Sequence, residues 1–270
     1  MSPIAPGELT VRVAADATGR TRIATLRQRY PQRVTMALHT DSEHPRSATL
    51  CVQSPSGGAF SDDDLHTTVH CAPGTHLQLT SQAATQVFAG DGPGARHRLS
   101  FTVETGAVLE YLPKTVIPQA SSRFTQTLGL NIADGGVYIG WDAIAAGRIA
   151  HGERFRYAGV DNAFSVRSEG HVLARDRQII TPDVSGMLDG DYLATLLVVI
   201  PGQSPQAVLE RARAALDGLA GIAGGAGELP FHSGVFIRLT AEHAPALREA
   251  QRHLHAAARA TMTRQLRRSA

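Results

Sequence analysis

Thiols, aromatic side chains and long apolar runs are all scarce in this chain of 270 residues. The two cysteines, Cys51 and Cys71, form neither a CxxC motif nor a disulfide framework, so we expect reduced thiols. The best apolar run, residues 193–200, is far shorter than the roughly 18–20 residues that cross a bilayer. The first residues contain neither a basic nor an apolar signal region. These absences predict a cytoplasmic protein without membrane spans.

An excess of charge of one sign is also lacking, because 26 basic and 24 acidic side chains leave a formal net charge of +2. This balance removes the usual electrostatic argument for nucleic acid as the main partner. Hydrophobic residues make up 43% of the chain, which is enough for a core. An all-β fold of this length commonly stays undivided, so we expect residues 1–270 to form a single domain. The local basic excess lies near the C-terminus, at Arg248, Arg252, Arg259, Arg264, Arg267 and Arg268.

Familiar enzyme motifs are absent as well. The chain contains no P-loop, no HExxH, no GxSxG and no GxGxxG, and its two cysteines lack zinc-finger spacing. No nucleophile and base stand in a recognisable order, which argues against an enzyme.

Short segments rich in Val, Thr, Leu and Ile alternate with turn residues through most of the chain, without a helical stripe of apolar residues. This pattern predicts strands. They are expected at residues 10–13, 22–26, 48–52, 99–103, 137–144, 153–157, 163–167 and 171–180 and, after a connection at 181–191, at 192–200.

Glycine-centred turns recur between the expected strands, at Gly74, Gly106, Gly135 and Gly170. Their separations are 32, 29 and 35 residues, which indicates stacked hairpins or a solenoid-like pair of sheets.

Helical patterns appear only near the C-terminus. Ser204 is a good N-cap with Pro205 at the first helical position, and this helix should end near Gly221. A last strand is expected at residues 232–240 and a final helix at about 242–267. The predicted fold is therefore mainly β: one elongated, β-helix-like domain of stacked antiparallel and mixed sheets, with two α-helices near the C-terminus.

Residues 54–88 hold the densest polar chemistry of the chain. Because side chains alternate along a strand, His66 and His70 face one side, and His76 can join them after the next turn. One hairpin would then gather three imidazoles. The pattern is typical of a solvated sheet face, and it also suits a weak, open metal path. Imidazole binds nickel, copper, zinc and iron, and the carboxylates at 62–64 concentrate dications.

Several segments together resemble the UreD (UreH) family of urease accessory proteins. Residues 54–58 (SPSGG) are followed by Asp63, and then come residues 81–88 (SQAATQVF) and 106–113 (GAVLEYLP). The loop after Gly58 departs from the family pattern, because Ser61 and Asp62 stand where glycines are usual. The resemblance covers nearly the whole chain, through 140–142 (GWD), 146–155 (AGRIAHGERF), 167–177 (RSEGHVLARDR) and 234–238 (GVFIR).

The resemblance implies a non-catalytic, β-rich scaffold for urease maturation. Such a protein binds the urease apoprotein and a UreF-like accessory protein, which in turn holds a UreG-like GTPase that delivers nickel. No cofactor is tightly bound, and nickel is in transit through an internal passage. Matched to the family motifs, Asp63, Asp142 and Asp176 would be polar groups on this route, with His66 three residues after Asp63. Neither nucleic acid nor a membrane is an expected partner.

Two other functions fit parts of the pattern. A β-sandwich metal-dependent hydrolase would use His66, His70 and His76 with Asp63. A carbohydrate- or peptide-binding β module is the third option, although five tyrosines and one tryptophan offer few stacking surfaces.

Overall fold

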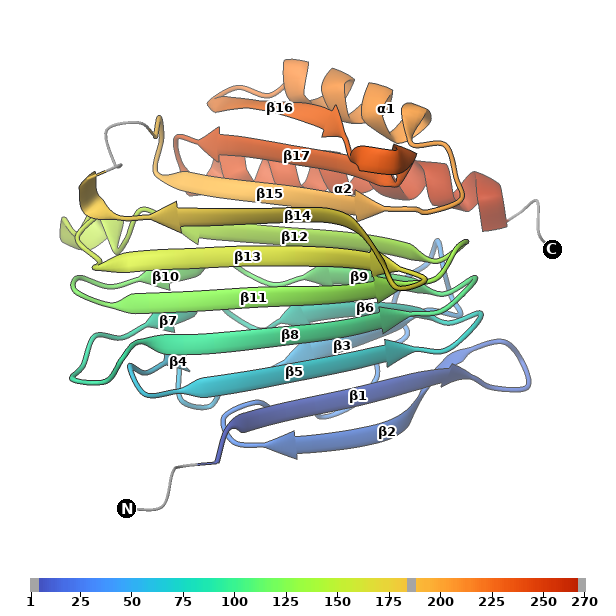
Figure 1. The fold of residues 1–270 in the computed structure, drawn as a ribbon, viewed down its shortest axis with the longest axis horizontal. Coiled ribbons are helices and arrows are strands. Elements are labelled where there is room, and N and C mark those ends of the chain that lie inside the picture. The colour runs from blue at the N-terminus through green and yellow to red at the C-terminus, as the bar shows by residue number, and fades with distance from the viewer. Residues whose placement is uncertain (1–4, 184–187, 267–270) are drawn as a thin grey trace.

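Two β-sheets packed face to face form the body of the protein (Figure 1). The structure is a computed structural model that describes residues 5–183 and 188–266, with side chains up to residue 260. Within these residues, the seven-stranded sheet has the order β14 (His171–Ile180), β13 (Gly159–Ser168), β11 (Arg123–Ile132), β8 (Ala95–Val103), β5 (Asp64–Cys71), β1 (Gly7–Ala15) and β2 (Thr21–Arg29).

The second sheet has ten strands among the described residues. Its continuous strands are β16 (Ile222–Glu228), β17 (Gly234–Ala241), β15 (Tyr192–Val199) and β12 (Val137–Ala145). Beyond β12 it divides into two short rows. One row is β9 (Val108–Leu112), β6 (His76–Ser81) and β3 (Ala48–Val52), and the other is β10 (Val116–Pro118), β7 (Thr85–Val87) and β4 (Gly58–Ala59).

Between residues 48 and 168 the chain winds as a solenoid. Each coil places its first half in the ten-stranded sheet and its second half in the seven-stranded sheet, and successive coils pair in parallel. Gly74, Gly106 and Gly135 turn the chain at the same corner of successive coils with φ of 72°, 70° and 76°, a conformation that glycine adopts without strain. The 32- and 29-residue separations are therefore coil lengths, whereas Gly170 lies in the hairpin between β13 and β14.

Three of the coils are broken on the side of the ten-stranded sheet. β3 and β4, β6 and β7, and β9 and β10 are each one side of a coil, interrupted by a few residues. In the next coil β12 runs without a break and pairs with both β9 and β10. The breaks are consequently stacked in register across three coils.

Apolar side chains fill the space between the sheets in two clusters, and a third cluster lies under the helices. Leu50, Leu79 and Phe101 belong to the larger interior cluster, and Val87 and Phe124 to the smaller one. α2 (Ala244–Leu266) packs on the outer face of β12, β15 and β17, and α1 (Gln206–Asp217) packs against α2 and β16 (Figure 1). No helix within the described residues combines the length and apolar character needed to cross a membrane.

The mainly β fold, its stacked sheets and the two late helices are confirmed. Residues 171–180 form β14 and residues 192–199 form β15, as predicted; residues 184–187 of the connection between them lie outside the described chain. The last part of the basic C-terminus, Arg267 and Arg268, also lies outside it.

Two local predictions are wrong. The expected hairpin around residues 72–75 is a corner, because β5 pairs with β1 and β8 in one sheet and β6 pairs with β3 and β9 in the other. Residues 153–157 form no strand and follow a short 3-10 turn. The glycine-rich residues after Gly221, for which no element was predicted, form the edge strand β16, because pairing with β17 outweighs the weak strand propensity of glycine.

Candidate functional site

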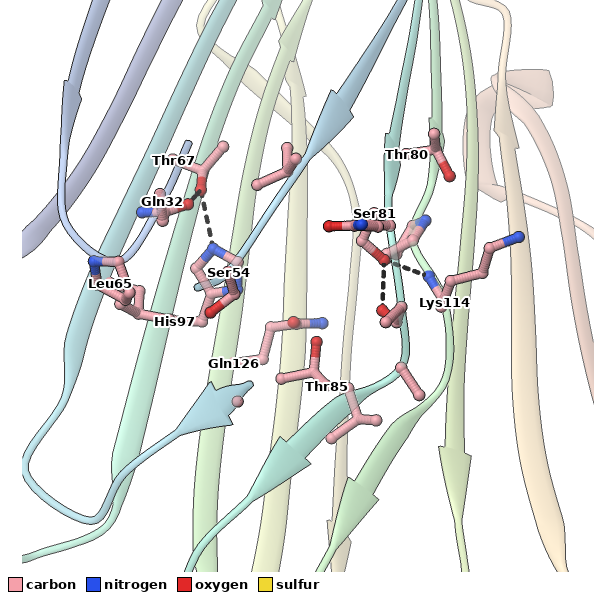
Figure 2. A pocket seen from close by; sticks show the side chains of 18 of the residues that line it. Gln32, Ser54, Leu65, Thr67, Thr80, Ser81, Thr85, His97, Lys114 and Gln126 are labelled. Atoms are coloured by element: carbon pink, nitrogen blue, oxygen red, sulfur yellow. Dashed lines mark hydrogen bonds between the residues drawn. The ribbon is translucent and has the colours of Figure 1, made fainter. Parts of the chain in front are cut away.

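A cavity of about 130 Å³ lies between the two sheets, next to the stacked strand breaks. Its walls carry polar groups that point into an otherwise apolar interior, among them Gln32, Thr67, His97 and Gln126 (Figure 2). One water molecule needs only ~10–15 Å³ of such space, so the cavity can hold several.

The mouth of this first cavity is built from the strand breaks. Ser54 and Gly57 come from the break between β3 and β4, residues 82–84 from the second break, and Pro113 and Lys114 from the third. Gln82, Ala83 and Lys114 are exposed, so the cavity opens to solvent there. Segments that are about 30 residues apart in the sequence therefore surround one opening.

A row of polar side chains crosses the inner face of the seven-stranded sheet. His97 on β8 pairs in register with Gln126 on β11, Gln126 with Asn162 on β13, and Asn162 with Gln178 on β14. Each of these residues occupies an inward position that apolar residues hold elsewhere on the same strand, as Phe124 and Leu130 do on β11. We call this row the amide row.

Asp142 faces the amide row from β12. Gln126 Nε2 donates to Asp142 Oδ1 at 3.2 Å, and Asn162 Nδ2 donates to Oδ2. Burial raises the pKa of Asp142, and the two amide donors oppose that rise. Among the described residues no arginine, lysine or histidine forms an ion pair with this carboxylate. Asp142 is therefore an interior carboxyl group without a cationic partner.

A second cavity, of about 50 Å³, continues from the first. The two share Tyr111, Gln126 and Asp142 as lining residues, so these side chains stand at their junction. Burial and the nearby Asp142 carboxylate raise the pKa of Tyr111, which keeps its phenol protonated. Asp176 on β14 lines the far end, where Arg238 Nη2 of β17 donates to Asp176 Oδ2 at 2.5 Å.

Three side chains fix the polar wall at the start of the amide row. Thr67 Oγ1 donates to Gln32 Oε1 at 2.6 Å, so its oxygen accepts from His97 Nε2 at 2.9 Å. Burial lowers the pKa of His97 to about 4, and the ring is neutral at physiological pH. This wall consequently adds no positive charge to the first cavity.

The four residues expected on a metal route separate into two groups. Asp142 and Asp176 line the second cavity, whereas neither cavity is lined by Asp63 or His66. Asp63 lies in the loop before β5, where its Oδ2 accepts from Phe60 N at 2.8 Å. His66 faces outward from β5, with its Nε2 3.2 Å from Asp64 Oδ1.

The three histidines of the hydrolase alternative are not gathered. His70 lies on the outer face of the seven-stranded sheet, 3.0 Å from Glu104 Oε1, whereas His76 belongs to the other sheet. No group of three or more histidine, cysteine, aspartate or glutamate side chains is arranged to hold a metal ion in the part of the chain that the structure describes. The geometry does not support the hydrolase.

His76 instead takes part in a second polar cluster, under α2. Glu110 on β9 is fully buried, and its two carboxylate oxygens each lie 2.5 Å from an imidazole Nε2, that of His76 and that of His255. Arg259 Nε lies 3.2 Å from Glu110 Oε1, and the same guanidinium bonds Asp41. We call these five residues the Glu110 cluster. The cluster ties α2 to β6, to β9 and to the loop that holds Asp41.

Sequence reasoning missed the amide row, Arg238 and the Glu110 cluster. The available signal was a polar residue at an inward position of an apolar alternation, as at Gln126 and Asn162. It becomes specific only once the register aligns these positions across strands.

Comparison with known proteins identifies the family of this chain. The family model described as UreD urease accessory protein matches residues 5–269. A protein from Mycolicibacterium gilvum named urease accessory protein UreD is 61% identical over 95% of this chain and 94% of its own length. Relatives from Streptomyces griseus (29% identical; 97% of this chain, 93% of theirs) and Cenarchaeum symbiosum (27%; 90% and 88%) carry names of the same family. The motif segments at 54–58, 81–88 and 106–113 all contribute to the walls of the first cavity. The chain belongs to the UreD family of urease accessory proteins.

Proposed function

We propose that this protein is a non-catalytic scaffold that binds the urease apoprotein and guides Ni²⁺ through its interior toward the urease active site. The observation that carries the proposal is Asp142, a carboxyl group without a cationic partner at the junction of two interior cavities. In the same proposal a UreF-like accessory protein docks on the scaffold in the cytoplasm and brings the UreG-like GTPase.

The chemistry of the interior suits an ion in transit. A dication needs oxygen or nitrogen ligands that attract it without holding it, and a closed cage of thiolates or imidazoles would retain it. The amide row and Asp142 offer amide oxygens and one carboxylate spread over four strands, β11, β12, β13 and β14. Cys71 is no ligand on this route, because it is fully buried in the apolar core and burial raises the pKa of its thiol to about 12.

Nickel loading of urease tests the proposal. Urease subunits are co-expressed with the UreF-like and UreG-like proteins and either no scaffold, the wild-type chain or Asp142→Asn. Nickel per urease is measured by mass spectrometry. We expect loading only with the scaffold, and a roughly tenfold loss for Asp142→Asn, the lower end of the effect of removing a group around a metal.

The matched control is Asp161→Asn. Asp161 lies on β13 beside Asn162 but faces outward, where Arg177 Nε and Nη2 bond its carboxylate at 2.8 and 2.6 Å. This variant should load urease like the wild type. A pull-down of urease with each variant shows whether the complex still forms. If Asp142→Asn and wild type load equal amounts of nickel in complexes of equal yield, the proposal of an interior route is wrong.

A further inference from the structure

Arg238 is the inward-facing cation at the far end of the second cavity. Side chains alternate along β17, so Phe236 and Arg238 face the space between the sheets while Ile237 packs under the helices. In register, Asp142 on β12 pairs with Thr195 on β15, and Thr195 pairs with Arg238. Neighbouring strands are about 4.8 Å apart, so the backbone positions of Asp142 and Arg238, two strands apart in the ten-stranded sheet, are separated by about 10 Å.

Contacts on several sides hold the guanidinium in place. Its Nη2 donates to Asp176 Oδ2 at 2.5 Å. With its amide oxygen facing Arg238, Gln178 accepts from Nε and Nη2 at 2.5 and 2.6 Å. The guanidinium also lies over the Phe236 ring, 4.8 Å from the ring centroid. A planar, bonded and stacked guanidinium has a defined position, which a lysine ammonium would lack.

We propose that Arg238 closes the far end of the nickel path by occupying the Asp176 carboxylate that a passing dication would otherwise bind. This inference rests on the proposed function and adds a means of regulating the passage of the ion. The guanidinium neutralises Asp176 and repels a dication that approaches from Asp142. The Arg238 side chain is 35% exposed, so a carboxylate on a docked protein can reach it from outside and draw it away from Asp176.

Direct binding of NiCl₂ to the purified full chain tests the closure. Arg238→Met keeps an aliphatic stem over Phe236 and removes the charge, so Asp176 becomes available. We expect Ni²⁺ to bind this variant roughly tenfold more tightly than the wild type in equilibrium dialysis. Adding Asp176→Asn should return the affinity to the wild-type level, and Arg238→Lys, which keeps a cation there, should change it little.

The matched control is Arg177→Met, which releases the Asp161 carboxylate on the outer face and should leave Ni²⁺ affinity unchanged. Arg238→Gln replaces Arg238→Met if the latter does not fold. Equal Ni²⁺ affinity of wild type and Arg238→Met, or a gain that survives Asp176→Asn, would overturn the closure. The Asp142→Asn loading experiment separates the two proposals, because it reports on the path whether or not Arg238 closes it.

Discussion

The Glu110 cluster makes a sharp prediction about stability. Glu110→Gln keeps the shape of the side chain and removes its charge, while His76, His255 and Arg259 still converge on it. An amide offers one acceptor oxygen and places an NH₂ group against donors that the carboxylate accepted. Glu110 has no exposed surface, so water cannot replace the lost acceptor. The variant therefore leaves buried donors around residue 110 without acceptors.

The expected cost follows from burial. Removing one partner of a buried charged pair costs about 3–5 kcal/mol, a large part of a typical unfolding free energy of about 5–15 kcal/mol. At about 2–4 °C per kcal/mol for a chain approaching this size, Tm should fall by about 6–20 °C. The loss should appear first in α2, because His255 and Arg259 connect that helix to β9 and to Asp41.

Glu104→Gln is the control for this measurement. Glu104 also pairs with a histidine, His70 at 3.0 Å, but its side chain is 41% exposed. Exposed pairs contribute about 0–1 kcal/mol, so this variant should melt close to the wild type. Circular dichroism gives Tm for both, and hydrogen exchange of the α2 amides shows whether that helix loosens.

The contribution of Glu110 to the free energy of unfolding depends on pH with a definite sign. The histidine hydrogen bonds outweigh desolvation and lower the pKa of Glu110. A carboxylate with a lowered pKa stabilises the fold above its unfolded pKa of about 4.3, and that contribution is lost as the pH falls below it. The difference in Tm between wild type and Glu110→Gln should therefore be at its full size at pH 7 and become smaller below about pH 4. A Glu110→Gln variant that melts within about 3 °C of the wild type at pH 7 would refute this account of how α2 is held.

Three further predictions concern the interior and the mouth. The pKa of His97 is lowered to about 4, so this side chain stays neutral in the folded protein at a pH where it takes up a proton in the unfolded chain. Acidification from pH 6.5 to 4 should therefore destabilise wild type by up to about 3 kcal/mol more than His97→Gln, as measured by denaturant titration. Gly58→Ala should cost about 1–3 kcal/mol in the same assay, since its Cβ would lie 2.2 Å from the Gln86 carbonyl oxygen. A thiol reagent should leave Cys71 unmodified in the folded protein and modify it after unfolding.

Local patterns predict the strands and the coil corners well, because each depends on a few neighbouring residues. Gly74, Gly106 and Gly135 were recognisable from their spacing, and a turn with positive φ explains each. The direction of the chain after a corner depends on distant pairing instead. The turn at Gly74 therefore looked like a hairpin, although β6 pairs with β3 and β9 in the other sheet.

The site was predictable only in part for the same reason. Asp142 and Asp176 were identified through family motifs, and the structure places both on one cavity. Asp63 is in a motif too, but its carboxylate accepts a hydrogen bond within its own loop. The partners of Asp142 carry no motif. Gln126 and Asn162 matter because the parallel register sets them side by side, which is information that a single strand does not contain.

The stacked strand breaks have a consequence for how the entrance tolerates change. The opening is framed by three successive coils, so its shape is a property of the repeat and cannot be adjusted by one loop alone. Losing one residue between β6 and β7 would turn the side chains of β7 to the opposite face or shift β7 against β4 and β10. Substitutions around the mouth of the first cavity should thus be tolerated far more readily than insertions or deletions in the coils. The mouth should keep its dimensions wherever the coil length is kept.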